Sequence, residues 1–528
     1  GEIASARAYI TALGLYEARL NGNRVGDQLL TPGYTNYRKR LQYQTYDVTG
    51  MLNAGANAIG VYLGDGWYKG NALMGGNYNL FGSEGSLLIQ VVIKYKDGRV
   101  QYVTSDKDWK SITGPILMSD IFKGETYDAR LEKTGWDMPG YDDKNWYPAK
   151  PAKGRFDILV AGEGVPVRGI QEIKPLKLLD SPRGGTIVDM GQNMVGWVRL
   201  AISGKKGTEI TVRHAEVLDS EGCIYTANLR GADQTVKYIL KGEGCEVYTP
   251  HFTFQGFRYL LVINQLQHNI LWSQKGNFVD VPTDCPQRDE RLGWLGDAQV
   301  FIKTACFNMN VAPFYTKWLE DVKSEQLENG SLPHVAPNAI AGRFGYWPEH
   351  GSSGWGDAST VCPWTIYMCY GDRSILERQY STMKGWVDYI GTQTENHIWN
   401  KGFHFGDWLA LDGQPESNSR FGGTTFDLLA TAYYALSVSI VVKTSRVLEI
   451  DNDTEKYSEI LRAIKEAFRG EFLTKRGRLS SNTQTSYVLA LMFDLLEEPE
   501  KQLAVKRLAN DIKLRNNRLT TGFLGTPH

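Results

Sequence analysis

A change in hydrophobic periodicity near residue 263 most constrains what this chain can fold into. Before that point, short runs of strand-forming residues alternate with turn residues, as in 86–95 followed by Lys96-Asp-Gly. After it, long segments carry apolar residues at helical spacing, and residues 433–443 carry them on more than one face, as a buried helix does. The pattern predicts antiparallel β-sandwich modules followed by a helical half.

The length of the chain indicates several domains, because 528 residues are too many for one hydrophobic core. In the second β region, Ile210, Val212 and His214 alternate onto one face of a predicted strand. We expect an N-terminal β-sandwich with a linking segment in residues 1–165, a second β-sandwich in 166–262, and a helical domain in 263–528. Helices are predicted near residues 264–274, 297–308, 311–328, 358–371, 374–394, 425–448, 453–470, 483–497 and 498–514.

Composition excludes several classes of function. The net charge is −1, from 58 basic and 59 acidic residues, so no nucleic-acid or anionic-membrane partner is expected. No run reads as apolar and long enough to insert into a membrane. The six cysteines form no CxxC pair and no Cys/His zinc pattern, so no metal site is expected. The 14 Trp and 28 Tyr suit a carbohydrate-binding protein.

The first residue is Gly1, not Met, which is consistent with a removed signal peptide or with a fragment. On that reading, a periplasmic or secreted location is favoured over a cytoplasmic one. The sequence does not give the oligomeric state.

Residues 284–297 contain many charged side chains of the kinds that a catalytic site needs. Asp284, Asp289, Glu290 and Asp297 fall within fourteen residues, together with Arg288, Arg291 and Trp294. Pro286, Gly293 and Gly296 make a continuous helix unfavourable, so the stretch reads as a loop that feeds a helix from about Asp297. The sequence of residues 284–297 is DCPQRDERLGWLGD.

Carboxylates beside arginines and a tryptophan suit cleavage of a glycosidic bond. One carboxylic acid must donate its proton to the leaving oxygen, while ionised carboxylates can hold sugar hydroxyls. An aromatic face can cover the C–H face of a sugar ring. From charge alone, a salt-bridged loop that caps a helix is the more common structure, by roughly two to one.

The full string CPQRDERLGWLGDAQ, with Asn277-Phe-Val-Asp-Val-Pro-Thr upstream, resembles the signature of the bacterial α-L-rhamnosidases of glycoside hydrolase family 78. Strings in both β regions, such as GLYEARLNG and FTFQGFR, resemble that family's sandwiches. The resemblance implies an (α/α)6-type helical barrel after the β modules. It also implies that Glu290 is the general acid and that Asp284, Trp294 and Asp297 hold rhamnose, with Arg288 able to orient the carboxylates.

Two loops between predicted helices place Trp and Asp together in glycine-containing contexts, Ser353–Asp357 and His404–Trp408. The resemblance implies that Trp355 and Trp408 line the rhamnose pocket, where the sugar's methyl group needs an apolar wall. Two packing tryptophans between helices are the alternative. Asp357 and Asp407 are candidates for carboxylates that support the pocket. His334, His350 and His404 are read as ordinary polar residues and not as metal ligands.

The chain departs from the family pattern in two places. Residues 259–262 run directly into 263–266, where the family has a connecting segment, and the chain stops at His528, where the family's barrel continues. The family's general base lies in that continuation, in a Trp-Glu context. The general base is therefore unknown here and is expected outside these residues. Glu349, Asp407 and Glu416 are internal candidates that nothing in the sequence distinguishes.

The sequence thus predicts an inverting hydrolase that releases terminal non-reducing α-L-rhamnose, with no cofactor. Burial and the neighbouring Asp284 and Asp297 are expected to raise the pKa of Glu290. Two alternatives remain: a rhamnose-binding protein that has lost catalysis, and a helical-toroid hydrolase of another sugar. A panel of nitrophenyl glycosides would separate the last from a rhamnosidase.

Overall fold

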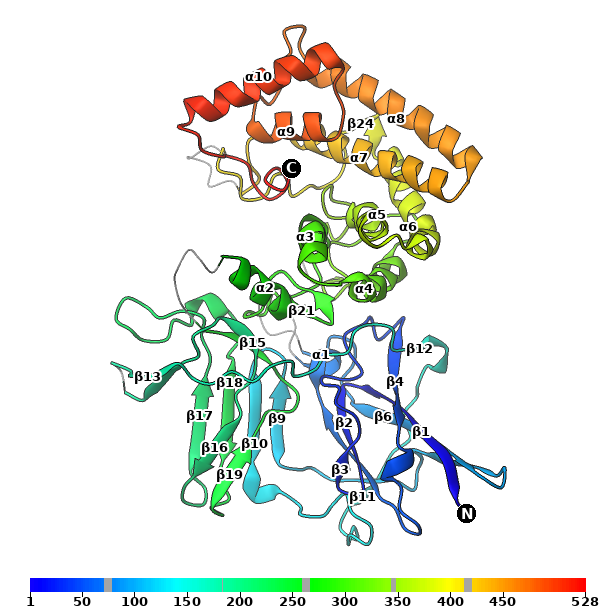
Figure 1. Ribbon diagram of the computed structural model, residues 1–528, viewed down its shortest axis with the longest axis vertical. Helices are drawn as coiled ribbons and strands as arrows, with labels where there is room; N and C mark the ends of the chain where they lie inside the picture. The colour runs from blue at the N-terminus through cyan, green and yellow to red at the C-terminus, as the bar shows by residue number, and fades with distance from the viewer. Residues whose placement is uncertain (71–77, 183, 259–265, 343–347, 413–419) are drawn as a thin grey trace. The chain divides into compact units, whose positions relative to one another are not determined.

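The computed structural model describes residues 1–70, 78–182, 184–258, 266–342, 348–412 and 420–528. The chain divides into two compact units, Gly1–Leu292 and Gly293–His528, each described by itself below. The first unit is built from strands and the second from helices (Figure 1). The predicted fold class, β-sandwich modules followed by a helical domain, is confirmed.

The first sandwich packs a five-stranded sheet, in the order β12-β4-β1-β6-β7, against a three-stranded sheet, β3-β2-β5. Alternation along β1 sends Ala6, Ala8 and Ile10 into the core between the sheets. The strands of these two sheets are β1 Ile3–Leu13, β2 Leu15–Leu20, β3 Asn23–Arg24, β4 Leu41–Asp47, β5 Ile59–Gly64, β6 Ser86–Tyr95, β7 Val100–Thr104 and β12 Leu159–Ala161.

The second sandwich contains a four-stranded sheet in the order β17-β18-β10-β9, whose core includes Val236 and Tyr238. Ile210 and Val212 pack against that core, as their alternation predicts. The strands of this region are β9 Ile116–Asp120, β10 Gly124–Asp128, β13 Lys177–Asp180, β14 Thr186–Asp189, β15 Met194–Gly196, β16 Leu200–Ser203, β17 Glu209–Arg213, β18 Thr235–Ile239, β19 Cys245–Tyr248 and β20 Gln255–Phe257.

The chain crosses between the two sandwiches before residue 165. β9 and β10 pair in the sheet that also contains β17 and β18, whereas the later β12 returns to pair with β4. Between them, β8 (Lys110–Ser111) pairs with β11 (Tyr147–Pro148). The expected domain boundaries at 165/166 and 262/263 stay predictions, and the junction at 259–263 lies outside the described residues. The unit ends with α2 Leu266–Asn277, β21 Phe278–Val279 and β22 Val281–Pro282, and its short α1 spans Gly66–Lys69.

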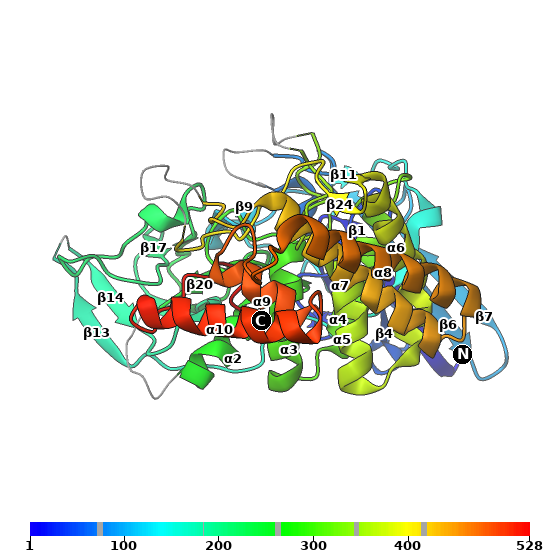
Figure 2. The same cartoon turned by 90° about the horizontal axis from the view of Figure 1, so that it is seen from above.

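The second unit consists of helices that lie within a few residues of the predicted segments, except that the helix expected over 483–497 ends at Met492. Successive helices pack as neighbours, as α7 with α8 and α9 with α10 do in both views (Figures 1 and 2). The helices are α3 Leu295–Asn308, α4 Ala312–Glu325, α5 Ala358–Tyr370, α6 Arg373–Thr392, α7 Phe426–Val447, α8 Asp451–Phe472, α9 Gln484–Met492 and α10 Glu498–Leu514, with a hairpin of β23 Thr394–Glu395 and β24 Ile398–Trp399.

Helix α7 corrects one expectation from the sequence. Its 22 residues are long and apolar enough to cross a membrane, although no such run was expected. Of that apolar window, 72% is buried inside the structure, as in the core helix of a soluble protein. Packing against α8, α6 and α5 therefore accounts for apolar residues on several faces of α7.

Candidate active site

The loop that follows β22 is fastened to the first unit by Arg291. This buried side chain donates from Nη1 to the carbonyls of Pro286 (2.8 Å) and Phe254 (3.3 Å), and from Nη2 to that of Ile121. Its guanidinium also lies over the ring of Phe254, 4.3 Å from the centroid. Burial lowers the pKa of Arg291 to about 10. Arg291 therefore braces the loop, which explains a charge that the sequence could not assign.

Glu290 lies between two guanidinium groups. Its Oε2 is 2.5 Å from Nη1 of Arg230 and 2.9 Å from Nη2 of Arg288. The Glu290 side chain remains 21% exposed, so a ligand can reach it. Arg230 stands sixty positions earlier in the chain, in the loop before β18. Sequence reasoning missed Arg230, because nothing in its local pattern points to residue 290.

Asp284 shares this cluster. Its Oδ1 accepts a hydrogen bond from the backbone N–H of Leu292 (3.1 Å), and its Oδ2 lies 4.0 Å from Nη2 of Arg288. Burial, reinforced by the charge of Glu290, raises the pKa of Asp284 to about 7, although Leu292, Cys285 and Arg288 oppose the shift. Asp284 is therefore a carboxyl that can hold its proton near neutral pH.

Asp289 faces inward. It is fully buried beside Gly231, where an added Cβ would lie 2.5 Å from Asp289 Oδ2. Burial raises its pKa. Asp289 thus lies against the loop that carries Arg230, and a side chain at position 231 would require the Asp289 carboxylate to shift.

In the second unit, Phe405 brings together the three tryptophans that the sequence predicts to bind sugar. Its ring centroid lies 4.3 Å from that of Trp355, 5.9 Å from that of Trp408 and 6.3 Å from that of Trp294. Trp355 is buried, whereas Trp294 and Trp408 are partly exposed. Phe405 was not among the predicted residues, although it belongs to the same loop as Trp408.

Two indole groups of this cluster are suited to a polar ligand. The Nε1 atoms of Trp294 and Trp355 are buried and have no hydrogen-bond acceptor among the residues that the structure describes. A buried donor without a partner costs about 1–3 kcal/mol, so a hydroxyl group of a ligand would relieve that cost. The apolar ring faces of this cluster could line a site for the methyl group of a deoxy sugar.

Glycines shape this part of the second unit. Helix α3 begins at Leu295, two residues earlier than expected, with Trp294 at its N-cap and Asp297 in its first turn. Gly296 lies inside this helix. A Cβ added at this position would be 2.6 Å from Cε2 of Trp355. The expectation that Gly296 interrupts the helix was therefore wrong. Packing of Trp355 accounts for the glycine.

Asp357 and Asp407 are fully buried and hold the loops of the two tryptophans. Asp357 accepts hydrogen bonds from the Gly354 backbone N–H (2.7 Å) and Trp386 Nε1 (3.0 Å), and burial raises its pKa to about 6. The donors to Asp407 are Thr485 Oγ1 (2.5 Å) and the backbone N–H groups of Gly522 (2.7 Å), Leu524 (2.9 Å) and Gly525 (3.0 Å). Both carboxylates therefore hold backbone segments in place, and their support of a sugar pocket stays a prediction.

Among the residues that the structure describes, neither Asp407 nor Glu349 stands out as a general base. Asp407 is already surrounded by donors, and Glu349 Oε1 accepts the backbone N–H of Gly342 at 2.6 Å. Glu416 lies outside the described residues. Of the three histidines, His404 accepts at Nδ1 from the Ser353 backbone N–H (3.1 Å) and His334 Nε2 lies 2.9 Å from the carbonyl of Pro348.

Among the described residues, one group could offer three metal-ligating atoms, Asp219, Glu221 and Cys223, within 4.8 Å of one another. Oδ1 of Asp219 accepts the backbone N–H groups of Glu221 (3.0 Å) and Cys223 (2.9 Å). This tight turn explains why the three side chains lie together.

The predicted residues therefore form two groups. Asp284, Arg288 and Glu290 make one ion-paired cluster in the first unit. Trp294, Trp355 and Trp408 meet on Phe405 in the second unit. The motif at residues 284–297 therefore belongs to both units, because the first unit ends at Leu292 and the second begins at Gly293.

Comparison with known proteins defines the class first. Residues 261–528, just over half of the chain, match the bacterial α-L-rhamnosidase six-hairpin glycosidase domain. Residues 1–171 match the α-L-rhamnosidase N-terminal domain, and residues 180–277 match the bacterial α-L-rhamnosidase concanavalin-like domain. The chain belongs to the bacterial α-L-rhamnosidase family.

Individual relatives agree with this assignment. An α-L-rhamnosidase of Streptomyces avermitilis is 40% identical over all of this chain and 52% of its own length, and one from Formosa agariphila is 38% identical over all of this chain and 60% of its own. The crystal structure of native α-L-rhamnosidase from Aspergillus terreus matches with a TM-score of 0.94 at 39% identity, over 99% of this chain and 64% of that one. The Streptomyces avermitilis enzyme complexed with L-rhamnose matches with a TM-score of 0.92 at 40% identity, over 100% and 53%. The chain thus spans about half to two thirds of the length of these relatives.

Proposed function

We propose that this chain is part of a glycoside hydrolase that releases terminal non-reducing α-L-rhamnose from rhamnosides or rhamnose-containing polysaccharides. The observation that carries the proposal is the Glu290 carboxyl, partly exposed and held by Arg230 and Arg288 within a motif of the rhamnosidase family. A relative 40% identical to this chain was crystallised with L-rhamnose bound, which supports the choice of sugar.

Glu290 is the proposed general acid. It protonates the leaving oxygen as the glycosidic bond breaks, and a second carboxylate deprotonates a water molecule on the opposite face of the sugar. Inversion requires these two carboxyl groups to be roughly 6.5–9.5 Å apart, which leaves room for the water. We assign the second role to no residue of this chain. The chemistry needs no cofactor.

The remaining predicted residues are proposed to bind the sugar. A carboxyl such as Asp284, with a pKa of about 7, can either donate a hydrogen bond to a hydroxyl oxygen or accept one from a hydroxyl group. Arg288 orients Asp284 and Glu290, and Asp297 is proposed to accept from a ring hydroxyl. Trp294, Trp355 and Trp408 are proposed to supply the apolar wall for the methyl group and indole N–H donors.

The proposal is tested by an NMR time course with a nitrophenyl α-L-rhamnoside, which follows the anomer that is released first. Early β-rhamnose would support both the rhamnosidase activity and the inverting mechanism. Early α-rhamnose would keep the substrate but overturn inversion. Binding of rhamnose without release would favour the alternative of a binding protein that has lost catalysis.

A further inference from the structure

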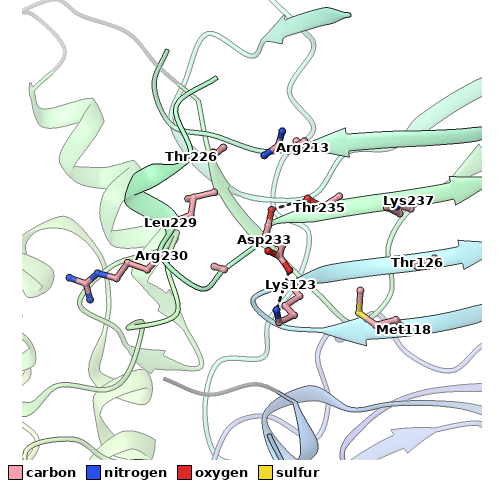
Figure 3. Close-up of a pocket in the computed structure, with 11 residues that line it drawn as sticks. Met118, Lys123, Thr126, Arg213, Thr226, Leu229, Arg230, Asp233, Thr235 and Lys237 are labelled. Carbon is pink, nitrogen blue, oxygen red and sulfur yellow. Dashed lines mark hydrogen bonds and ion pairs between the residues drawn. The ribbon is translucent and has the colours of Figure 1, made fainter. Parts of the chain in front are cut away.

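A pocket of about 400 Å³ lies on the second sandwich of the first unit (Figure 3). Its volume falls within the range of about 300–1,000 Å³ typical of small-molecule sites. The pocket is lined by residues of four neighbouring strands and of the loop before β18. The lining side chains are Met118, Lys123, Thr126, Arg213, Thr226, Leu229, Arg230, Ala232, Asp233, Thr235 and Lys237.

The floor of the pocket is the outer face of the β17-β18-β10-β9 sheet. Val236 and Tyr238 point into the core, so Thr235 and Lys237 project from the opposite face. Strand pairing places Arg213 opposite Thr235, and Thr126 between Met118 and Lys237. Figure 3 shows these side chains along adjacent strands, with Thr226 and Leu229 at one end.

The lining contains more basic than acidic residues. Four of its residues are cationic (Lys123, Arg213, Arg230 and Lys237), whereas Asp233 is its one acid. Lys123 pairs with Asp233 at 3.2 Å and Lys237 with Glu209 at 3.1 Å. Arg213 is exposed and has no ion-pair partner among the residues that the structure describes. The pocket therefore has positive charge left to meet a ligand.

Arg230 connects this pocket with the proposed general acid. It belongs to the lining, and its guanidinium extends away from the strands in Figure 3 and reaches Oε2 of Glu290. Its backbone adopts φ 55° and ψ −114°, a conformation that L-residues rarely adopt. Backbone strain of this kind persists where the surroundings impose it, often at binding sites. The pocket and the Glu290 carboxyl therefore share one residue, Arg230, which lines the former and contacts the latter.

From this arrangement we infer that the pocket is a subsite for the sugar on the leaving-group side of the cleaved bond, and that it takes an acidic sugar, one bearing a carboxylate or sulfate. Arg213 and Lys237 bind the anionic group, and the exposed Met118 contacts the C–H face of the ring. The leaving oxygen then lies on the side of the pocket where Arg230 meets Glu290. This inference rests on the proposed function, because a leaving group exists only if the bond is cleaved.

The test compares rhamnosyl disaccharides whose second sugar is acidic in three cases and neutral in one. Their kcat/KM values are measured for α-L-rhamnosyl-(1→4)-glucuronate, for the galacturonate analogue, for a 6-sulfated rhamnosyl-glucose and for neutral rhamnosyl-glucose. We expect at least one acidic substrate to be preferred about tenfold or more over the neutral one, and the preference to fall with added salt. Equal values for all four substrates would overturn the inference.

Variants assign the preference to the pocket. Arg213→Gln and Lys237→Gln should each bring the acidic-to-neutral ratio toward one, and Arg213→Lys should keep most of it. Lys205→Gln, an exposed cation outside the lining, is the matched control and should leave the ratio unchanged. A ratio that survives both pocket variants would place the acidic sugar elsewhere and overturn the inference.

Direct titration distinguishes a failure of the pocket proposal from a failure of the proposed rhamnosidase function. Methyl glucuronide, methyl glucoside and methyl glucoside 6-sulfate are titrated calorimetrically into the wild type and the Arg213→Gln variant. Hydrolysis of nitrophenyl α-L-rhamnoside without binding of either acidic glycoside would overturn the pocket while the proposed function stands. Arg213-dependent binding without hydrolysis of any rhamnoside would instead overturn the leaving-group role together with the proposed function.

Discussion

Nη1 of Arg230 lies 2.5 Å from Oε2 of Glu290, although the two residues belong to different loops of the first unit. Arg288 approaches the same oxygen at 2.9 Å. Glu290 is therefore held in place by one local and one distant arginine. The distant one ties the proposed acid to a β-sheet, so the sandwich takes part in positioning the carboxyl.

Arg230→Gln should lower kcat while Arg230→Lys restores part of it, because the ion pair positions the carboxyl. Without the ion pair the carboxyl is free to leave its position, so kcat should fall more than KM rises. A fall in kcat matched by a fall in the thermal unfolding midpoint would indicate that Arg230 supports the fold only.

Glu290→Gln should reduce kcat on rhamnosyl disaccharides by about 10²–10⁴-fold, the usual contribution of a general acid. Hydrolysis of nitrophenyl rhamnoside should fall less, because nitrophenolate leaves with little need for a proton. Binding of L-rhamnose, followed by tryptophan fluorescence, should persist. Glu466→Gln, an exposed glutamate on α8, serves as the control. Full activity of Glu290→Gln on a disaccharide would remove Glu290 from the role.

Asp284→Asn should change how stability depends on pH. The folded-state pKa of Asp284 is about 7, against about 3.9 for an unfolded aspartate, so its neutral form stabilises the fold fully below about pH 4. That contribution is lost as pH rises toward 7, by about 1.4 kcal/mol per pH unit. The variant should therefore gain on the wild type in unfolding midpoint between pH 5 and pH 7. Parallel pH curves for the two proteins would contradict the shift.

Much of the fold can be predicted from the local pattern of apolar and polar residues. The candidate site can be predicted only in part. Helix α10 spans Glu498–Leu514, as its periodicity predicts, because an amphipathic repeat and a capping residue are written into adjacent positions. Asp284, Arg288 and Glu290 were found because they lie in one short motif. The family resemblance assigned their roles, since charge alone favoured a salt-bridged loop.

The site residues that the sequence did not reveal are those whose neighbours are set by tertiary structure. Arg230 reaches Glu290 across sixty positions, and no local signal marks it. Phe405 looked like one aromatic residue among many until the fold placed three tryptophans around it. Gly296 was read as a helix breaker because the close approach of Trp355 is not visible in the sequence.

Trp408→Ala should weaken rhamnose binding about tenfold, which corresponds to about 1.4 kcal/mol. The indole packs beside Phe405 and Phe421, and its partial exposure leaves a face for the sugar. The loss should raise KM more than it lowers kcat. Trp364→Ala, which removes a partly buried tryptophan paired with Tyr367 on α5, is the matched control. Equal effects of the two variants would indicate general destabilisation and not a contact with the sugar.

Asp407→Asn should loosen the segment that follows α10. The carboxylate of Asp407 accepts the backbone N–H groups of Gly522, Leu524 and Gly525, whereas an amide offers only one oxygen. Each hydrogen bond lost from a charged acceptor costs about 1.5–3 kcal/mol. Hydrogen exchange at these three amides should therefore accelerate.

Because Phe523 donates its backbone N–H to the carbonyl of Trp408 (2.8 Å) and its ring lies 5.5 Å from that of Trp355, a loosened segment should also weaken rhamnose binding. Asp412→Asn is the control, since Asp412 accepts from Gly423 in the neighbouring loop and not from this segment. Fast exchange in Asp407→Asn alone, with weaker binding, would show that one buried carboxylate sets the shape of the tryptophan cluster. Unchanged exchange would mean that packing of Leu524 and Phe523 is sufficient to hold the segment.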